Sequence, residues 1–297
     1  MPNDVRSVYA YELHGHDARG PLNYEDFFSA LARTSPAQRQ YRRRNSTEVV
    51  AVPEIRVEDG RYLLRFVIGR EGDPALFYDL ESGRERRAEP GTSEVSVQTA
   101  WLIIDPRYRL VVQERRRPGV PLQEALRALV GIGRDQDLAP NPTISLGPIV
   151  ESTFADEVEE LDRIKSATIV LQQPNMSWTS AADSVLAEYA EDSNIGTIEI
   201  GATARPKESL SKGAGIVQEI KQMVASSFSP LKNARIVGRR SDEKKDRTVS
   251  LRKHAKRREI EIPSEATRAE EREAVLAGSL DYLDDLKLER GVPAEDQ

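Results

Sequence analysis

The chain has 297 residues and a formal net charge of -6, with 38% hydrophobic and 31% charged residues, which allows one large core or two modest ones. It contains no cysteine, which excludes disulfides, thiolate metal sites and a cysteine nucleophile. The N-terminal residues 1–13 lack a secretory signal pattern, and no apolar run approaches the roughly 18 residues of a membrane span. We therefore expect a cytoplasmic protein with no membrane segment.

The first half of the chain is dominated by strand patterns. Residues 7–14 alternate and place Tyr9, Tyr11 and Leu13 on one face. Asp59-Gly60, between two apolar runs, predicts a tight hairpin because the turn needs positive φ angles. Other expected elements are a helix after Asn23, strands over 75–80, 95–104 and 109–113, and a helix over 122–130 that ends at Gly131. Residues 1–135 are thus predicted to form an antiparallel β-meander, curled toward a barrel.

A Gly- and Pro-rich stretch over 131–148 is the expected domain boundary, and strands and helices alternate after it. The alternation predicts a layered α/β unit with right-handed crossovers over residues 136–297, within an α+β fold overall. Its expected elements are strands over 167–171, 197–202, 234–237, 248–251 and 259–262, with helices over 180–189 and 215–225. A long acidic helix is expected after Ser264. Gly278 inside it costs about 1 kcal/mol relative to alanine, so we expect packing to hold this helix.

The most uneven distribution of charge lies in a basic tract over residues 232–262. Lys232 to Arg258 include twelve Lys or Arg against three acids, which leaves about fifteen net negative charges on the rest of the chain. We expect these cations to bind phosphates of DNA or RNA. The tract contains no aromatic residue, which favours backbone contacts over base stacking. The candidate nucleic-acid-binding residues are Arg235, Arg239, Arg240, Lys244, Lys245, Arg247, Arg252, Lys253, Lys256, Arg257 and Arg258.

Two alternatives for the tract remain open. Its cations could be a solvated loop and edge strand, where Lys and Arg deter strand pairing, or internal counterions for the acidic helix that follows. Arg42 to Arg44 and Arg115 to Arg117 would extend the basic surface if folding brings them beside the tract.

A second candidate site is His14-Gly15-His16-Asp17, at the end of the first expected strand. Strand alternation would place both imidazoles on one side, where with the Asp17 carboxylate they could hold zinc, manganese or iron. The alternative is a polar turn. The sequence indicates no other cofactor, so the cofactor stays unknown. A serine triad is not indicated, because no GxSxG sequence is present and the chain has three histidines.

The order of these parts resembles that of uncharacterised bacterial proteins encoded among mobile-element and phage-defence genes. No single motif carries the resemblance, which extends over most of the chain and implies a role in nucleic-acid biology or antiviral defence. Our first hypothesis is a nucleic-acid-binding accessory protein. The second is a metal-dependent hydrolase or nuclease using His14, His16 and Asp17. The third is a protein-interaction or oligomerisation subunit that uses residues 264–290.

Overall fold

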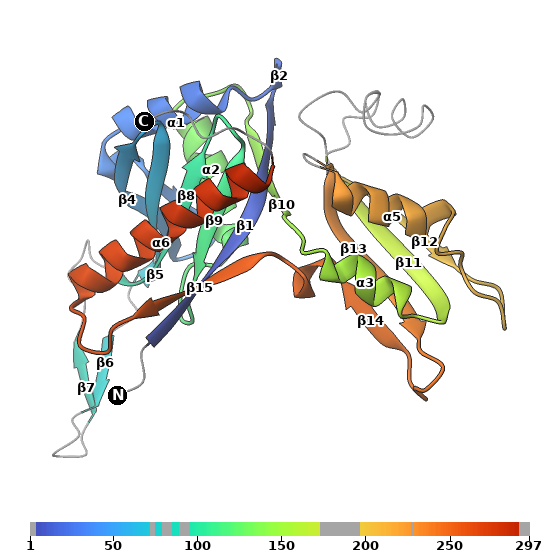
Figure 1. Ribbon diagram of the computed structural model, residues 1–297. Helices are drawn as coiled ribbons and strands as arrows, with labels where there is room; N and C mark the ends of the chain where they lie inside the picture. Colours follow the sequence, from blue (N-terminus) through green and yellow to red (C-terminus); the bar gives the residue numbers. More distant parts are fainter. Residues whose placement is uncertain are drawn as a thin grey trace.

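The computed structural model describes residues 4–71, 75–78, 85–88, 95–172, 197–226 and 229–290. It shows an α+β protein with two units joined by a narrow neck (Figure 1). The helix expected over 180–189 lies outside the described residues. None of the helices that the structure describes is long and apolar enough to cross a membrane.

The large unit is organised on a nine-stranded antiparallel sheet that curls into a half-barrel. Its path runs β10-β1-β9-β8-β5-β4-β3, and β15 and β2 also pair with β1. Asp59 and Gly60 turn β4 into β5 with φ angles of 49° and 75°, which confirms the predicted hairpin. The strands are β1 (Asp4–Asp17), β2 (Gly20–Pro21), β3 (Gln40–Arg42), β4 (Glu48–Glu58), β5 (Arg61–Glu71), β8 (Val95–Asp105), β9 (Leu110–Arg115), β10 (Thr143–Pro148) and β15 (Arg257–Ile262). A separate two-stranded hairpin, β6 (Ala75–Tyr78) with β7 (Glu85–Ala88), connects β5 to β8.

Helices α1 (Tyr24–Arg33) and α2 (Leu122–Asp135) cover one face of this sheet. Asn23 caps α1 as predicted, since its side chain accepts a hydrogen bond from the Asp26 N–H at 3.2 Å. The predicted end of α2 is wrong, because the helix continues through Gly131 to Asp135. A Cβ at Gly131 would overlap the ring of Tyr41, so this glycine makes room for packing instead of ending the helix.

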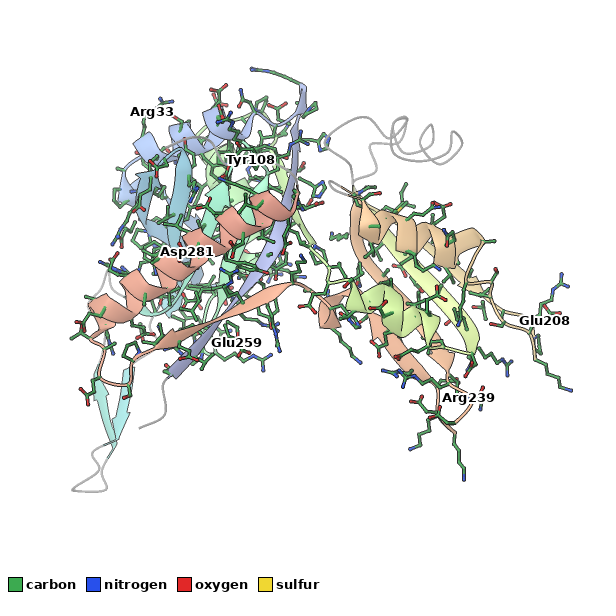
Figure 2. All side chains as sticks on the ribbon, viewed as in Figure 1. Arg33, Tyr108, Glu208, Arg239, Glu259 and Asp281 are labelled. Carbon is green, nitrogen blue, oxygen red and sulfur yellow. The ribbon has the colours of Figure 1, made fainter. Side chains whose placement is uncertain are left out.

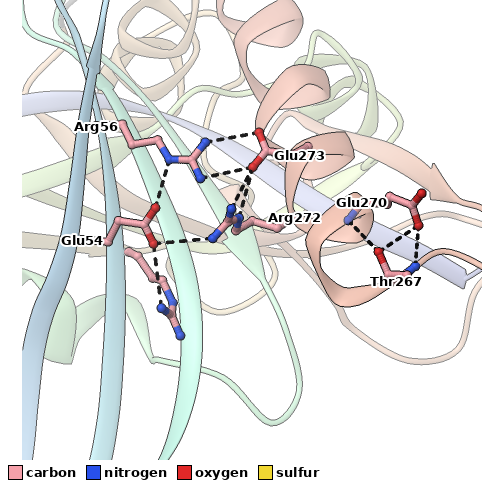
Figure 3. Close-up of polar contacts among 7 residues, drawn as sticks. Glu54, Arg56, Thr267, Glu270, Arg272 and Glu273 are labelled. Carbon is pink, nitrogen blue, oxygen red and sulfur yellow. Dashed lines mark hydrogen bonds and ion pairs between the residues drawn. The ribbon is translucent and has the colours of Figure 1, made fainter.

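The long helix α6 (Arg268–Glu289) covers the opposite face of the large sheet. It begins after Thr267, later than the predicted start at Ser264, because Thr267 and Glu270 form a reciprocal capping box (Figure 3). At Gly278 a Cβ would lie 2.8 Å from Cδ1 of Ile260 on β15. Gly278 therefore permits a close approach between α6 and the sheet. The buried apolar side chains of α6 are Val275, Leu276, Tyr282, Leu283 and Leu286.

The small unit is a four-stranded sheet in the order β12-β11-β13-β14. Helices α3 (Thr153–Glu159) and α5 (Gly215–Ala225) pack on one of its faces and enclose a second core. The expected alternation of strands and helices is present. All the described pairings are antiparallel, but β12 and β13 flank β11 on opposite sides and therefore run parallel to each other, so that α5 connects them by a crossover past β11. The strands are β11 (Arg163–Gln172), β12 (Thr197–Thr203), β13 (Leu231–Arg239) and β14 (Arg247–Ser250).

The small unit is inserted into the large one. β10 and β15 lie end to end along the same edge of β1, and the chain leaves for the small unit between them. The two connecting segments, 149–151 and 254–256, pair through Val150 and Ala255, and the Lys256 N–H donates to the Ile149 carbonyl at 2.7 Å. We call these two segments the neck. The expected division at residue 135 does not match the sheets, since β10, β15 and α6 belong to the large unit.

Candidate nucleic-acid interface

The fold divides the basic tract between the two units. β13, the turn over 240–246 and β14 lie in the small unit, whereas β15 lies in the large sheet. The short helix η3 (Leu251–Lys253) stands between them at the neck. A continuous run in the sequence is thus spread over a longer surface.

Two of the candidate cations are counterions for α6. Lys256 pairs with Glu289, and Arg258 pairs with Asp285. The Arg258 guanidinium carbon also lies 4.6 Å from the ring centroid of Tyr282. These two cations are therefore internal counterions of α6, as one of the two alternatives for the tract had it.

Two further candidates neutralise acids of the short helix α3 and its C-cap. Arg247 pairs with Glu157, and Arg240 pairs with Glu160. These contacts attach the β13–β14 hairpin to the helix layer of the small unit. Four of the eleven candidates are therefore ion-paired within the chain.

Five candidates have no acidic partner within the described part of the chain: Arg235, Arg239, Lys244, Lys245 and Arg252. Lys253 donates to the Thr248 carbonyl at 3.2 Å. Lys244 and Lys245 are exposed on the turn between β13 and β14. Because no described acid neutralises these five cations, they are the predicted residues that can bind an external anion.

Arg235 lies on the face of the small sheet opposite α3 and α5, because its neighbours Ala234 and Ile236 are buried under those helices. We call this the open face. Arg235 pairs in register with Thr168 on β11 and Ser250 on β14. Hydroxyl side chains therefore flank this guanidinium on both sides.

The end of the small sheet is hollowed beside the β13–β14 turn, in a cavity of about 440 Å³. Four cations and two acids line it together with Ser241, so the lining has an excess of positive charge. The Ser241 N–H donates to the Asp162 carboxylate at 2.6 Å, and this hydrogen bonding with Ser241 lowers the pKa of Asp162. Figure 2 shows Arg239 at this end of the unit, away from the large sheet. The charged lining residues are Asp162, Arg163, Arg239, Arg240, Glu243 and Lys244.

At the neck, tyrosines of β1 and arginines from three other segments come together. Tyr9 pairs in register with Arg257 of β15, and its hydrogen bond with the Arg257 side chain raises the pKa of that guanidinium. The Arg115 guanidinium carbon lies 5.2 Å from the Tyr9 ring centroid. Burial raises the pKa of Tyr11, while the charges of Arg115 and Arg252 oppose this shift and so lie near its hydroxyl. We call these five residues the neck patch.

The neck patch adds two things to the basic tract that the sequence predicted: a further arginine and aromatic rings. Arg115, from the arginine triplet 115–117, does lie beside the tract, whereas Arg42 is on β3 at the far edge of the large sheet. Aromatic rings that the tract lacks are supplied by β1, because β15 pairs with that strand. Glu151 and Glu259 also act electrostatically on Arg257, so the patch is cationic but not purely so.

The open face and the neck patch lie on the same side of the molecule. In Figure 1, α3 and α5 are drawn in front of the small sheet and α6 in front of the large one. The open face is opposite α3 and α5, and Tyr11 packs on the face opposite α6. Both surfaces therefore point away from the viewer. Together they extend from Arg239 through Arg235 and Arg252 to Arg115.

The structure does not assemble the expected metal site. His14 is only 1% exposed, neither of its ring nitrogens has a hydrogen-bond partner among the described residues, and Nε2 lies 3.8 Å from a Glu12 carboxylate oxygen. The Asp17 side chain instead accepts from the Arg19 N–H at 2.7 Å and closes the turn into β2. In the described parts of the chain, no three His, Asp or Glu side chains are grouped as metal ligands. His16 is buried near Thr143 on β10.

His254 forms an unexpected hydroxyl–imidazole–carboxylate chain at the root of the neck. Its Nε2 lies 2.6 Å from the Glu157 carboxylate and its Nδ1 lies 3.1 Å from the Thr153 hydroxyl. The pKa of His254 is lowered, and the main cause is desolvation of the ring by burial. Arg247 also holds Glu157, and the Glu151 N–H donates to the His254 carbonyl at 2.9 Å. These contacts attach α3 to the end of η3 and to the neck. The three side chains resemble a catalytic triad in their order, but here they connect two parts of the structure.

Helix α6 makes up most of the residues 264–290 that were expected to bind a partner, and its apolar stripe is covered by the large sheet, since its buried residues pack on β8, β9 and β15. Residues 264–290 therefore present their polar side, not this stripe, to the surroundings.

These features define a class of protein: an α+β scaffold with a four-stranded unit inserted into a curled antiparallel sheet, and a cationic surface across both. No protein-family model matches the chain, and no curated protein matches it in sequence.

Proposed function

We propose that this protein binds nucleic acid through the phosphate backbone, along the open face and the neck patch. One observation carries the proposal. Arginines from β9, β13, η3 and β15 come together on one side of a chain whose net charge is -6. Four other cations of the tract are neutralised by acids of α3, its C-cap and α6, whereas Arg235, Arg239 and Arg252 have no acidic partner within the described residues.

The chemistry of the open face supports the same proposal. Arg235 can donate to phosphate oxygens, and the hydroxyls of Thr168 and Ser250 beside it are of the type that also contacts phosphates. Such contacts fix the position of a nucleic acid without reading its sequence. We therefore expect binding that depends steeply on salt and weakly on sequence.

The test compares two triple variants that remove equal charge. Arg235→Ala, Arg239→Ala and Arg252→Ala remove cations of the proposed surface. Arg19→Ala, Arg43→Ala and Arg44→Ala remove exposed cations of the large unit away from it. Binding of labelled DNA and RNA is measured by fluorescence anisotropy between about 50 and about 200 mM salt.

The first variant should flatten the slope of log K against log salt by about 0.9 for each phosphate that the protein no longer neutralises, and the second should leave the slope unchanged. An equal weakening of binding in both variants would mean that only net charge matters. Absence of binding to any polymer at the lowest salt would remove the proposal.

The resemblance in layout to proteins of phage-defence gene neighbourhoods supports a place for this binding in antiviral defence. Phage challenge of cells that express the native chain or the first triple variant tests it. Protection by the native chain, abolished in the variant, is the expected result.

A further inference from the structure

We propose that the neck patch selects single-stranded nucleic acid, with a base stacked at Tyr9 and the flanking phosphates held by Arg115, Arg252 and Arg257. This inference rests on the proposed function and specifies its substrate class.

The surroundings of Tyr9 favour stacking. Tyr11 packs against the main core of the large sheet, whereas Tyr9 lies outside that core and stays partly exposed. Its hydroxyl is held by Arg257 and its ring is covered by the Arg115 guanidinium at 5.2 Å. Both contacts are present before any ligand binds. A base can stack on the guanidinium plane or displace it from the ring, since both are stacking partners for bases.

The placement of charge fits the same ligand. Arg115 comes from β9 on one side of β1, and Arg257 comes from β15 on the other. An aromatic ring with a cation on each side matches a strand whose base is stacked and whose adjoining phosphates are paired. In a duplex the bases are stacked on one another inside the helix, so Tyr9 would make no such contact.

The surface that leads from the neck patch to Arg239 also suits a single strand of nucleic acid. Arg252 leads to Ser250 and Arg235 on the open face, where the hydroxyl residues Thr168 and Ser250 flank Arg235. A backbone can follow this surface from the neck patch toward Arg239. The expected footprint therefore crosses the neck.

The experiment uses the full chain and strands of about 16 nucleotides, the upper range of such sites. The probes are single-stranded DNA, single-stranded RNA, duplex DNA and a deoxyribose-phosphate strand that carries no bases. The variants are Tyr9→Ala, which removes the ring, and Tyr9→Phe, which keeps it and removes only the hydroxyl. Circular dichroism and the thermal midpoint establish that each variant is folded.

Tyr9→Ala should weaken binding of the single strands by about 5- to 150-fold, the range expected when one base no longer stacks. Its salt slope should not change, because stacking releases no counterions. Binding of the duplex and of the baseless strand should stay the same. Tyr9→Phe should remain within a few-fold of the native chain. The ratio of DNA to RNA affinity decides which polymer the patch prefers.

Equal binding of the native chain to the normal and the baseless single strand would overturn the stacking inference, even if Tyr9→Ala fails to fold. So would equal weakening of duplex and single strand by Tyr9→Ala. Both outcomes leave backbone binding in place. If no polymer binds at low salt, the baseless strand included, the proposed function itself fails.

Discussion

At the scale of single residues, Gly278 shows how one position couples a helix to the sheet below it. The sequence predicted that packing must offset the helix cost of this glycine, and the contact with Ile260 confirms the prediction. Gly131 has a similar role in α2 beside Tyr41, but the pattern there predicted a helix end. The two glycines cannot be distinguished locally, because the deciding neighbour lies far away in the sequence.

We expect Gly278→Ala to destabilise the protein by about 1 kcal/mol. The helix gains about 1 kcal/mol from alanine, but crowding of the new Cβ against Ile260 costs about 1–3 kcal/mol. In an Ile260→Val background the missing Cδ1 gives space, so the same change should become neutral or stabilising. Urea unfolding of the four proteins measures this coupling. Stabilisation in both backgrounds would show that the Ile260 contact does not decide the effect.

At the scale of elements, α6 is held by ion pairs as well as by its apolar stripe. Arg56 of β4 binds Glu273 through two guanidinium nitrogens at 3.2 and 3.1 Å and also bonds Glu54 (Figure 3). Further along, Arg61 pairs with Asp284 at 2.5 Å. The acidic character of α6 is thus matched by cations of the sheet.

The pH dependence of one such pair is predictable. Hydrogen bonding to Arg56 lowers the pKa of Glu273 below its ordinary value. A lowered pKa stabilises the folded state above the unfolded pKa, and this contribution disappears as the pH falls through the folded pKa. Since the Glu273 side chain is 54% exposed, Glu273→Gln should cost only about 0.5 kcal/mol at pH 7. The native and variant proteins should converge in thermal midpoint at about pH 3. A difference that persists there would assign the effect to packing.

The elements themselves were largely predictable, and their partners were not. Asp59-Gly60 fixes a hairpin by local geometry, and the strands over 95–104 and 109–113 lie within β8 and β9 with small shifts at the ends. The basic tract was visible as a run of charge, but ion pairs such as Arg258 with Asp285 depend on where α6 packs. Tyr9 could not be assigned to the site from sequence, because only the pairing of β1 with β15 brings it to Arg257.

At the scale of the whole molecule, the insertion could not be seen in the pattern of strands and helices. The Gly- and Pro-rich stretch over 131–148 does precede the small unit, but β10 forms within it and returns to β1. Periodicity identifies a strand and does not say which sheet it joins.

The insertion predicts that the large unit folds without the small one. Val150 and Ala255 are directly bridged, so residues 151–254 can be replaced by Asn-Gly, a two-residue turn suited to a hairpin. The shortened protein should unfold cooperatively, with α6 still packed on the sheet. It should also lose salt-dependent binding at the open face while keeping Tyr9, Arg115 and Arg257. Thermal unfolding followed by near-ultraviolet circular dichroism checks the fold. A chain without a cooperative transition would show that the small unit is required for folding.

The end-to-end placement of β10 and β15 along β1 also has a consequence for synthesis on the ribosome. When β10 emerges it can pair with only the later half of that edge of β1, because β15 is made after the entire small unit. The small unit can complete its own core at this stage. The N-terminal half of the β1 edge is still unpaired then, and the sheet face that α6 will cover is still exposed. Unpaired strand edges and bare apolar faces are where nascent chains associate wrongly. β15 and α6, which are made after the small unit, are thus the segments that protect β1, and this nascent chain depends most on chaperones just before residue 257 appears.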